Sequence, residues 1–439
     1  MSLRLNVEQM GQAAGHCAVF RNAGKLRSVR GLLRAALPAF VGETCSVRLP
    51  TGEELTAEVV GFDESESQMM CYDSTVGLQP GLDIVAHGRR RAVPAGSGLL
   101  GRVIDGIGRP FDNAGPLRVR RFRPETAAVP DPMLRERITE PLVTGQRVID
   151  GLLTIGRGQR VGLFAGSGVG KSTLLGEIAK GAESDINVIC LVGERGREVR
   201  PFIEDCLGEE GMRRSVVVVA TSDQTPLMRI KAVLTAVSIA EDFRDQGNHV
   251  LFFLDSLTRL AMAQRELGLL LGEPPGARGY PPSVQSLLAE VLERLGCGDV
   301  GAITGLITVL VEGDDLDEPI TDAARSILDG HIVLDRKLAS QGHFPAIDVL
   351  GSVSRLFREV TSPQQQADAV RLRNMMVTYA EVSDLIQIGA YKPGASQQVD
   401  RAVQLMPAVR HFLQQTVDER SAMSLTQQQL EILGKAWPW

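Results

Sequence analysis

Aromatic side chains and cysteines are scarce in this chain of 439 residues. Phe, Trp and Tyr together make up only 4% of it, so its core must pack mainly aliphatic side chains. Its six cysteines are scattered, and no two of them have the C-x-x-C spacing of zinc and redox motifs. This pattern favours reduced thiols over a metal site or a disulfide framework.

Long hydrophobic runs and excess positive charge are also missing. The longest mainly apolar stretch, residues 302–311, is about half of the ~20 residues that a membrane-spanning helix needs, and the first residues lack the apolar segment of a signal peptide. With 47 Lys and Arg against 53 Asp and Glu, the net charge of −6 argues against a surface built to bind nucleic acid. We therefore expect a soluble, cytoplasmic protein.

Glycine, in contrast, is abundant at 46 residues. The chain is too long for one domain of ~100–200 residues, so we expect two or three domains. Up to about residue 93 it has short β segments separated by turns, which predicts a small β-barrel or sandwich. The predicted strands there are 45–49, 55–62 and 68–72. Residues 96–116 are turn-rich, and we interpret them as a connecting segment.

From about residue 150, apolar strands alternate with amphipathic helices, a pattern typical of a parallel sheet covered by helices. The predicted strands are 160–164, 188–192, 216–220, 250–254, 303–311 and 331–334, and the predicted helices are 171–180, 228–244 and 283–295. After about residue 365 the strand signal ends. Segments 367–388 and 399–415 there predict a helical C-terminal domain.

Residues 165–172 read Ala-Gly-Ser-Gly-Val-Gly-Lys-Ser between a predicted strand and a predicted helix, the context of a phosphate-binding loop. Glycines let backbone N–H groups surround phosphates, and the helix N-terminus adds a positive dipole. Lys171 would neutralise phosphate oxygens, and Ser172 would coordinate Mg²⁺. Ala165 stands where the usual motif has glycine. The loop predicts binding of ATP and Mg²⁺ through Gly166, Ser167, Gly168, Val169, Gly170, Lys171, Ser172 and Thr173.

Two carboxylates end predicted strands of this sheet. Asp255 ends an apolar strand in the manner of a Walker B segment, and it would hold Mg²⁺ through the water shell of the metal. Glu194 follows strand 188–192, which we place next to the phosphate-loop strand, and it could orient the water that attacks the γ phosphate. On spacing alone, the alternative is a surface cluster of ion pairs made of Glu194, Arg195, Arg197 and Glu198.

Several sequence blocks, in one order, resemble the type III secretion and flagellar export ATPases, relatives of the catalytic subunits of the rotary ATP synthase. Besides the phosphate loop they are 193–198, 255–259, 273–282, 308–315 and 327–333. The resemblance implies an N-terminal β-barrel for ring assembly (1–95), a RecA-like P-loop NTPase domain with a parallel sheet (96–360) and an α-helical domain (361–439). It also implies a homohexameric enzyme that hydrolyses MgATP to ADP and phosphate to energise protein export.

The resemblance also implies roles for charged residues. Glu194 matches the catalytic carboxylate of the family, and Arg195 and Arg259 match arginines that line its catalytic site. Arg355 matches the arginine that a neighbouring subunit inserts into the active site, where it neutralises charge on the transferring phosphoryl group. A single subunit would then be a poor ATPase.

Adenine and partner contacts follow from the same resemblance. Phe344 matches an aromatic residue that packs on adenine, and Tyr391 would belong to the same wall. The loop 272–282 would face a central pore that holds a coiled-coil stalk protein. Further implied partners are a stator or regulator protein, the export gate and chaperone–substrate complexes.

The two ends of the chain are less informative. Leu3, Val7, Met10 and Ala14 have helical spacing, but this stretch is shorter than the amphipathic helix that the family uses for stator and membrane contact. Peripheral association with the bacterial inner membrane therefore stays open. Trp437 and Trp439 predict a frayed aromatic tail without a function that we can name.

Alternative hypotheses remain. The variant phosphate loop favours the flagellar branch of the family over the injectisome branch. A Rho-like hexameric RNA translocase shares this core, and the basic runs 89–91 and 118–123 support it, but residues 1–95 contain few aromatics for base stacking. A non-catalytic subunit that acts as a structural spacer in a ring is disfavoured by the presence of Glu194.

Overall fold

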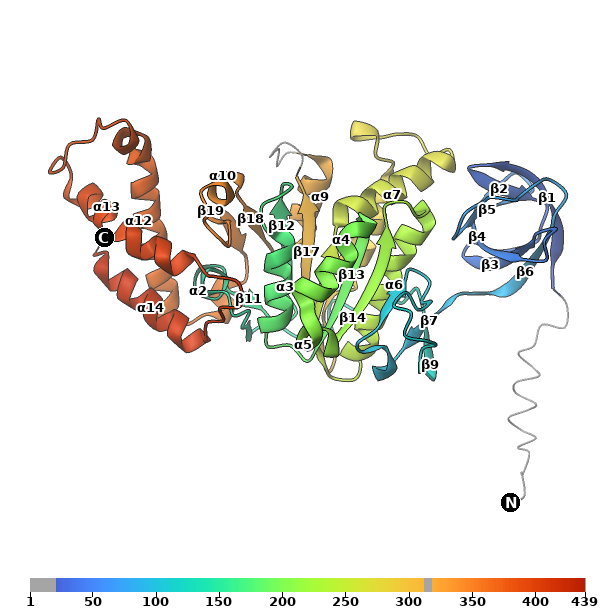
Figure 1. The fold of residues 1–439 in the computed structure, drawn as a ribbon, viewed down its shortest axis with the longest axis horizontal. Helices are drawn as coiled ribbons and strands as arrows, with labels where there is room; N and C mark the ends of the chain where they lie inside the picture. Colours follow the sequence, from blue (N-terminus) through green and yellow to red (C-terminus); the bar gives the residue numbers. More distant parts are fainter. Residues whose placement is uncertain (1–20, 312–317, 439) are drawn as a thin grey trace, which may run out of the picture. The chain divides into compact units, whose positions relative to one another are not determined.

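The computed structural model describes residues 21–311 and 318–438 (Figure 1). It forms two compact units: the first contains the described part of Met1–Ala92 with Gln224–Met228 and Glu266–Pro274, and the second contains the rest. The predicted N-terminal helical spacing, Trp439 and part of the 308–315 block lie outside the described residues.

The first unit is a closed six-stranded barrel in the order β1-β2-β5-β4-β3-β6. Its interior is aliphatic, as the composition predicts, with Leu26, Val47, Val59 and Ile84 almost fully buried. The barrel is confirmed, although the sequence pattern located only β3, β4 and β5. The strands are β1 (Ala23–Arg30), β2 (Leu32–Ala35), β3 (Glu43–Arg48), β4 (Glu54–Asp63), β5 (Glu66–Cys71) and β6 (Asp83–Arg90).

The second unit is built on a nine-stranded sheet, in which eight strands follow the order β19-β18-β12-β17-β15-β13-β14-β8 and β16 pairs with β17. β16 and β19 are antiparallel, and the other pairs are parallel. The strands are β8 (Val103–Asp105), β12 (Arg160–Ala165), β13 (Ile186–Glu194), β14 (Ser215–Thr221), β15 (His249–Asp255), β16 (Gly296–Cys297), β17 (Ala302–Leu310), β18 (Gly330–Leu334) and β19 (Ile347–Ser354).

The predicted parallel sheet is confirmed, with two corrections. β13 is not the neighbour of β12, because β17 and β15 lie between them. The segment 96–116 is not only a connection, since its residues Val103–Asp105 pair in parallel with β14 as the edge strand β8. Both differences concern strand pairing, which a periodic pattern does not encode.

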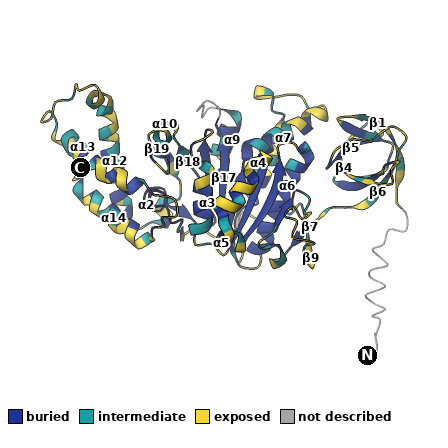
Figure 2. Ribbon diagram, in the orientation of Figure 1, coloured by how far each residue is buried: buried dark blue, intermediate teal, exposed yellow. Residues whose placement is uncertain are grey.

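Helices cover the sheet, and Figure 2 shows its central strands in the colour of buried residues. All residues of β14 and β15 are buried, as expected for strands packed on both faces. The helices of this part are α3 (Lys171–Gly181), α4 (Gly196–Pro201), a π-helix (Phe202–Leu207), α5 (Gly208–Arg213), α6 (Pro226–Arg244), α7 (Leu257–Leu270), α8 (Pro282–Glu293), α9 (Pro319–Ile327), α10 (Arg336–Ser340) and α11 (Phe357–Val360).

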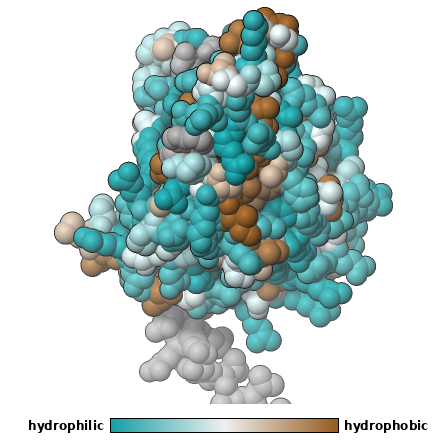
Figure 3. All heavy atoms as spheres, turned by 90° about the vertical axis from the view of Figure 1, so that its left-hand side faces the viewer, coloured by the Kyte–Doolittle hydropathy of each residue, from teal (hydrophilic) through white to brown (hydrophobic). Residues whose placement is uncertain are grey.

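Three helices form the C-terminal part: α12 (Pro363–Gln387), α13 (Gln397–Leu413) and α14 (Met423–Ala436). The serines Ser362 and Ser396 cap the first two, and the sequence pattern missed the third. Figure 3, which faces this side of the chain, shows apolar residues among polar ones, and α12 exposes Val370 and Leu385. No helix within residues 21–311 and 318–438 has the length and hydropathy needed to cross a bilayer.

The C-terminal helices share one hydrophobic core with the sheet through α2 (Arg147–Leu152), and this core contains Ile149, Leu372 and Phe412. Trp437 lies in the same core and is fully buried. The prediction of a frayed tail is therefore wrong for Trp437, because its ring packs inside the helical part. The exact domain boundaries at 95 and 360 remain a prediction.

The remaining elements are short. They are β7 (Ala92–Ala95), η1 (Ser97–Leu99), β9 (Arg121–Pro124), β10 (Pro141–Leu142), β11 (Ile155–Gly156) and η3 (Ala277–Gly279).

Asp150 of α2 is a carboxylate inside this shared core. It accepts hydrogen bonds from the backbone N–H of Thr144 at 2.9 Å, from Thr144 Oγ1 at 2.7 Å and from the N–H of Gly145 at 3.0 Å. Burial nevertheless raises the pKa of Asp150 to about 6, against an ordinary value of 3.8, because its desolvation outweighs these three donors.

We expect Asp150 to make the stability of the fold depend on pH. Because its folded pKa lies above its unfolded pKa, the folded chain binds this proton more tightly, and the corresponding stability is present below pH ~4. It is lost as the pH rises through about 6, by an amount on the order of 3 kcal/mol. Urea unfolding at about pH 5 and pH 7 should therefore show a smaller pH dependence in Asp150→Asn than in the wild type. Equal pH dependence in both proteins would contradict this assignment.

Candidate nucleotide site

The predicted phosphate loop has the expected strand–loop–helix geometry. β12 ends at Ala165, and α3 begins at Lys171. Gly168 and Gly170 have φ angles of 80° and 85°, in the left-handed region that favours glycine. An added Cβ on Gly170 would lie 3.3 Å from the ring of Phe344, so a side chain there would crowd this aromatic residue. The loop thus leaves its backbone accessible, which fits the binding of nucleotide phosphates.

The two predicted carboxylates meet at the start of α3. Lys171 Nζ lies 2.5 Å from Asp255 Oδ1 and 3.9 Å from Glu194 Oε1. Asp255 also accepts a hydrogen bond from Thr308 Oγ1 at 2.8 Å. Lys171 is the first residue of α3, and the other three side chains come from β15, β13 and β17, parallel strands whose carboxyl ends share one edge of the sheet. Glu194 therefore reaches Lys171 although its strand is not the neighbour of β12.

The surroundings of Glu194 suit a proton acceptor. Burial raises the pKa of its carboxyl group, and the negative charge of Asp255 raises it further. The positive charges of Lys171 and Arg259 lower it, but by less. A carboxylate with a raised pKa accepts a proton more readily, as general-base catalysis requires.

The alternative of a surface ion-pair cluster holds for the neighbours of Glu194 but not for Glu194 itself. Arg195 has an exposed side chain that pairs with Glu198 at 3.2 Å, and Arg197 lies 3.9 Å from the same carboxylate. In this chain Arg195 therefore points to solvent, whereas the Glu194 carboxylate faces Lys171.

Arg259, on the first turn of α7, packs closely against the segment that carries Glu194. An added Cβ on Gly193 would lie 2.8 Å from Arg259 Cβ, so only glycine permits this approach. The Nε atom of Arg259 is buried and has no hydrogen-bond partner in the described part of the chain.

A cavity of about 830 Å³ adjoins the phosphate loop. The ring of Phe344, 44% exposed, forms part of its wall. Tyr391 is not among the described residues that line it, and its hydroxyl donates to Asp400 Oδ1 at 2.9 Å instead. The structure thus does not bring Tyr391 to the wall predicted for it. The wall is completed mainly by residues that no motif marked: Gln146, Arg147, His411, Gln414, Gln415, Thr416, Val417 and Glu419.

Arg355 lies far from the phosphate loop of its own chain. It follows the edge strand β19, whose last residue, Ser354, pairs with Gly330 at the amino end of β18. Arg355 is level with Arg160, the first residue of β12, and the phosphate loop begins after Ala165, its last residue, which is roughly 16 Å away at ~3.3 Å per residue. The Arg355 side chain is exposed and donates to the carbonyl oxygen of Arg325 at 2.9 Å. It is therefore placed to act outside its own site.

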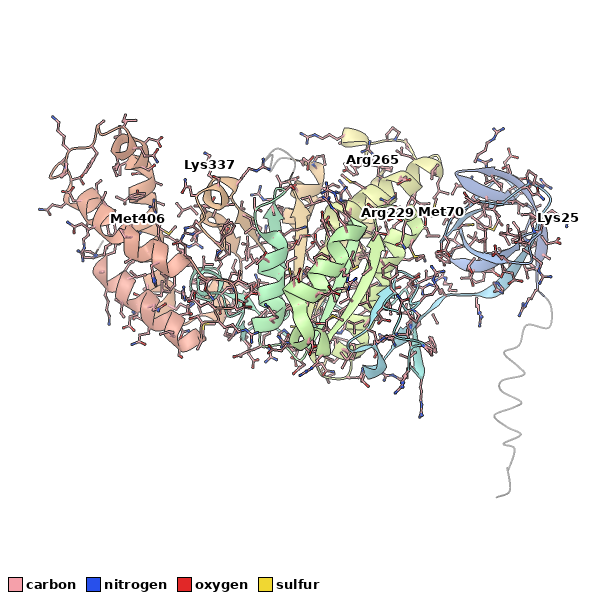
Figure 4. All side chains as sticks on the ribbon, viewed as in Figure 1. Lys25, Met70, Arg229, Arg265, Lys337 and Met406 are labelled. Atoms are coloured by element: carbon pink, nitrogen blue, oxygen red, sulfur yellow. The ribbon has the colours of Figure 1, made fainter. Side chains whose placement is uncertain are left out.

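The loop 272–282 is held partly by α7. Arg265, labelled in Figure 4, lies over the ring of Tyr280 at 5.2 Å from its centroid. Arg278 is exposed and has a φ angle of 50°, uncommon for a residue with a side chain. The loop thus presents a basic side chain on a constrained backbone.

Part of the basic run 118–123 is neutralised within the chain. Arg121 pairs with Asp242 at 2.6 Å, and Arg123 pairs with Asp245 at 2.8 Å. These ion pairs leave less free positive charge for the phosphates of a nucleic acid, which weakens the Rho-like hypothesis.

Comparison with known proteins agrees with this geometry. Residues 145–354 match the nucleotide-binding domain of the ATP synthase alpha/beta family, and residues 361–432 match the C-terminal domain of the type III secretion ATPase EscN. The chain is 50% identical to the flagellum-specific ATP synthase of Bacillus subtilis, over 91% of this chain and 92% of that protein. It belongs to the family of flagellar and type III secretion ATPases.

Both branches of these ATPases are represented among the relatives. The type 3 secretion system ATPase of Xanthomonas euvesicatoria is 46% identical over 95% of this chain and 94% of that protein. The structure of the assembled ATPase EscN from enteropathogenic E. coli has a TM-score of 0.89 at 43% identity, covering 94% of this chain and 100% of that chain. A further structure contains EscN with its central stalk EscO, at a TM-score of 0.87. The chain is therefore an ATPase of this family, and the Rho-like alternative is not favoured.

Proposed function

We propose that this ATPase hydrolyses MgATP to ADP and phosphate in order to energise flagellar protein export, with the injectisome branch as the alternative. The observation that carries the proposal is the meeting of Glu194 and Asp255 around Lys171 at the start of α3. A subunit that only bound nucleotide as a structural spacer would not need the partly buried carboxylate of Glu194 beside the phosphate loop.

Binding begins at the phosphate loop. The backbone N–H groups of residues 166–170 and the N-terminus of α3 bind the phosphates, and the Lys171 ammonium neutralises their oxygens. The residues that would hold a magnesium ion are Ser172 and Asp255. Mg²⁺, when bound, neutralises charge on the β and γ phosphates.

Catalysis then rests on Glu194 and two arginines. The Glu194 carboxylate orients the attacking water and accepts its proton, a role that its raised pKa favours. The Arg259 side chain packs against Gly193, the residue before Glu194, and we assign to its guanidinium group a donor for the γ-phosphate region. We assign to Arg355 the neutralisation of phosphoryl charge in the site of a neighbouring copy, since it is exposed and remote from its own loop.

The same assignment requires a ring, and we propose a homohexamer in which the barrels assemble the ring. EscN has been solved in its assembled form and with a central stalk, which supports a ring and a coiled-coil stalk partner here. The loop 272–282 would meet this stalk. We further propose a stator or regulator protein, the export gate and chaperone–substrate complexes as partners, and a cytoplasmic location with peripheral contact to the inner membrane.

The ring predicts that activity depends on protein concentration. Because each site needs Arg355 from another copy, the ATPase rate per subunit should rise steeply and sigmoidally as subunits assemble. Measurement of phosphate release against protein concentration, with light scattering to follow assembly, tests this expectation. A rate per subunit that stays constant from monomer to ring would contradict sites completed between subunits.

A further inference from the structure

The turn that follows α13 forms part of the nucleotide cavity without belonging to any nucleotide-binding motif. Gln415 lies at its centre and is mostly buried. Its Nε2 donates to the carbonyl oxygens of Gly145 at 2.7 Å and Glu419 at 2.6 Å, and its Oε1 accepts from the backbone N–H of Arg147 at 2.9 Å. All the polar atoms of this side chain are thus used inside the chain rather than left for a ligand.

Arg147 fixes the same turn from the other side. Its Nε donates to the carbonyl oxygen of Phe412 at 3.1 Å, and its terminal nitrogens donate to the carbonyl oxygen of Gln414 and to the carboxylate of Glu419. Arg147 is buried, and Glu419 is partly exposed at the rim. A buried arginine that bonds two carbonyls and one carboxylate holds a turn with little freedom, because leaving its donors unpaired would be costly.

One hydrogen bond connects this turn to the aromatic wall of the cavity. The backbone N–H of Gln415 donates to the carbonyl oxygen of Phe344 at 2.9 Å. The ring of Phe344 lies against Gly170 of the phosphate loop, so its backbone position determines how far the ring stands from the phosphate site. Displacement of Gln415 would therefore move the Phe344 wall relative to the loop.

We propose that Gln415, held by Arg147 and Glu419, is a positioning residue for the nucleotide base. It acts through Phe344 and through the 414–419 turn rather than by contact with the reacting phosphates. This inference rests on the proposed nucleotide site and separates two roles within it. The phosphate loop binds the triphosphate, and the turn after α13 sets the affinity for the base.

These two roles can be tested by comparing the binding affinities for ATP and for inorganic tripolyphosphate, which has the phosphates but no base. Gln415→Met keeps the length of the side chain and removes its three hydrogen bonds. We expect this variant to bind ATP about tenfold more weakly, since a factor of ten corresponds to ~1.4 kcal/mol, the scale of one lost hydrogen bond. Its affinity for tripolyphosphate should be unchanged. In steady state, KM for ATP should rise while kcat changes by less than about twofold.

Asp418→Asn is the matched control. Asp418 lies in the same turn, is largely exposed and bonds Lys180 on the outer side at 3.0 Å, and asparagine also tolerates its positive φ of 68°. This variant should leave both affinities unchanged. Glu419→Gln keeps the shape of the side chain but weakens its bond to Arg147, so it should weaken ATP binding as Gln415→Met does. If Gln415→Met does not fold, this second variant provides the test.

Equal losses of ATP and tripolyphosphate binding in a folded variant, or no loss of either, would overturn the positioning role. Equal affinity of the wild type for the two ligands would also overturn it, whereas a wild-type chain that binds neither ligand would contradict the nucleotide site itself. The two failures are therefore distinguishable.

Discussion

The Glu194→Gln variant should bind ATP as tightly as the wild type and hydrolyse it roughly 10³-fold more slowly. Glutamine has nearly the same shape but cannot accept a proton from the attacking water, and a general base contributes about 10²–10⁴ in rate. Removal of the charge also relieves repulsion with Asp255, so ATP binding should not suffer. Equilibrium binding of ATP together with single-turnover hydrolysis measures both effects.

Two further variants calibrate this experiment. Lys171→Ala should lose both binding and turnover, since Lys171 contacts the phosphates. Glu198→Gln changes a nearby exposed carboxylate that pairs with Arg195, and it should leave turnover unchanged. Hydrolysis by Glu194→Gln at the wild-type rate would contradict the catalytic role assigned to Glu194.

Replacement of Arg355 by alanine should reduce turnover by roughly 10³–10⁵, the usual contribution of an arginine finger. At ~1.4 kcal/mol for each factor of ten, this is a loss of about 4–7 kcal/mol of transition-state stabilisation. ATP binding to the separate subunit should persist, because Arg355 lies at the opposite end of β12 from the phosphate loop. Arg358→Ala, which changes another exposed arginine of the same segment, is the control and should keep its activity.

Mixing identifies which subunit supplies the arginine. Inactive Lys171→Ala and inactive Arg355→Ala subunits, combined, should recover part of the activity, because a Lys171→Ala subunit can offer its intact Arg355 to an intact phosphate loop next to it. Native mass spectrometry verifies that mixed rings form. Absence of recovery at every mixing ratio, in verified mixed rings, would contradict action between subunits.

The sequence predicted which residues are buried better than which strands pair. Continuous apolar runs identified β12, β13, β14, β15 and β17, because strands buried on both faces need apolar residues throughout. The predicted strand β18 is also present, although its residues alternate between buried and partly buried. The order of the strands across the sheet was wrong for β13, since two later strands insert between it and β12. Glu194 nevertheless reaches Lys171, because parallel strands bring their carboxyl ends to one edge whatever their order.

Local motifs identified the phosphate loop, Asp255 and Glu194, but not the residues that complete the cavity. Gln415 and Arg147 are far apart in the sequence, and their contact depends on how α13 packs against α2. Tyr391 was predicted to line the adenine wall; in this chain it lies in a loop outside the cavity and bonds Asp400, a contact that its aromatic character did not indicate. Trp437 likewise is buried through tertiary packing that no short pattern could reveal.

The position of Arg355 at the far end of the sheet has a consequence for how a ring would switch on. If each phosphate loop uses the arginine of the next subunit, an open row of subunits always has one complete site fewer than it has subunits. Closure of the row into a ring completes the last site. Loss of the arginine in one subunit would then inactivate the site of the neighbouring subunit and leave the site of the mutated subunit active. Partners that open or close the ring would thus control the number of working sites as well as their rate.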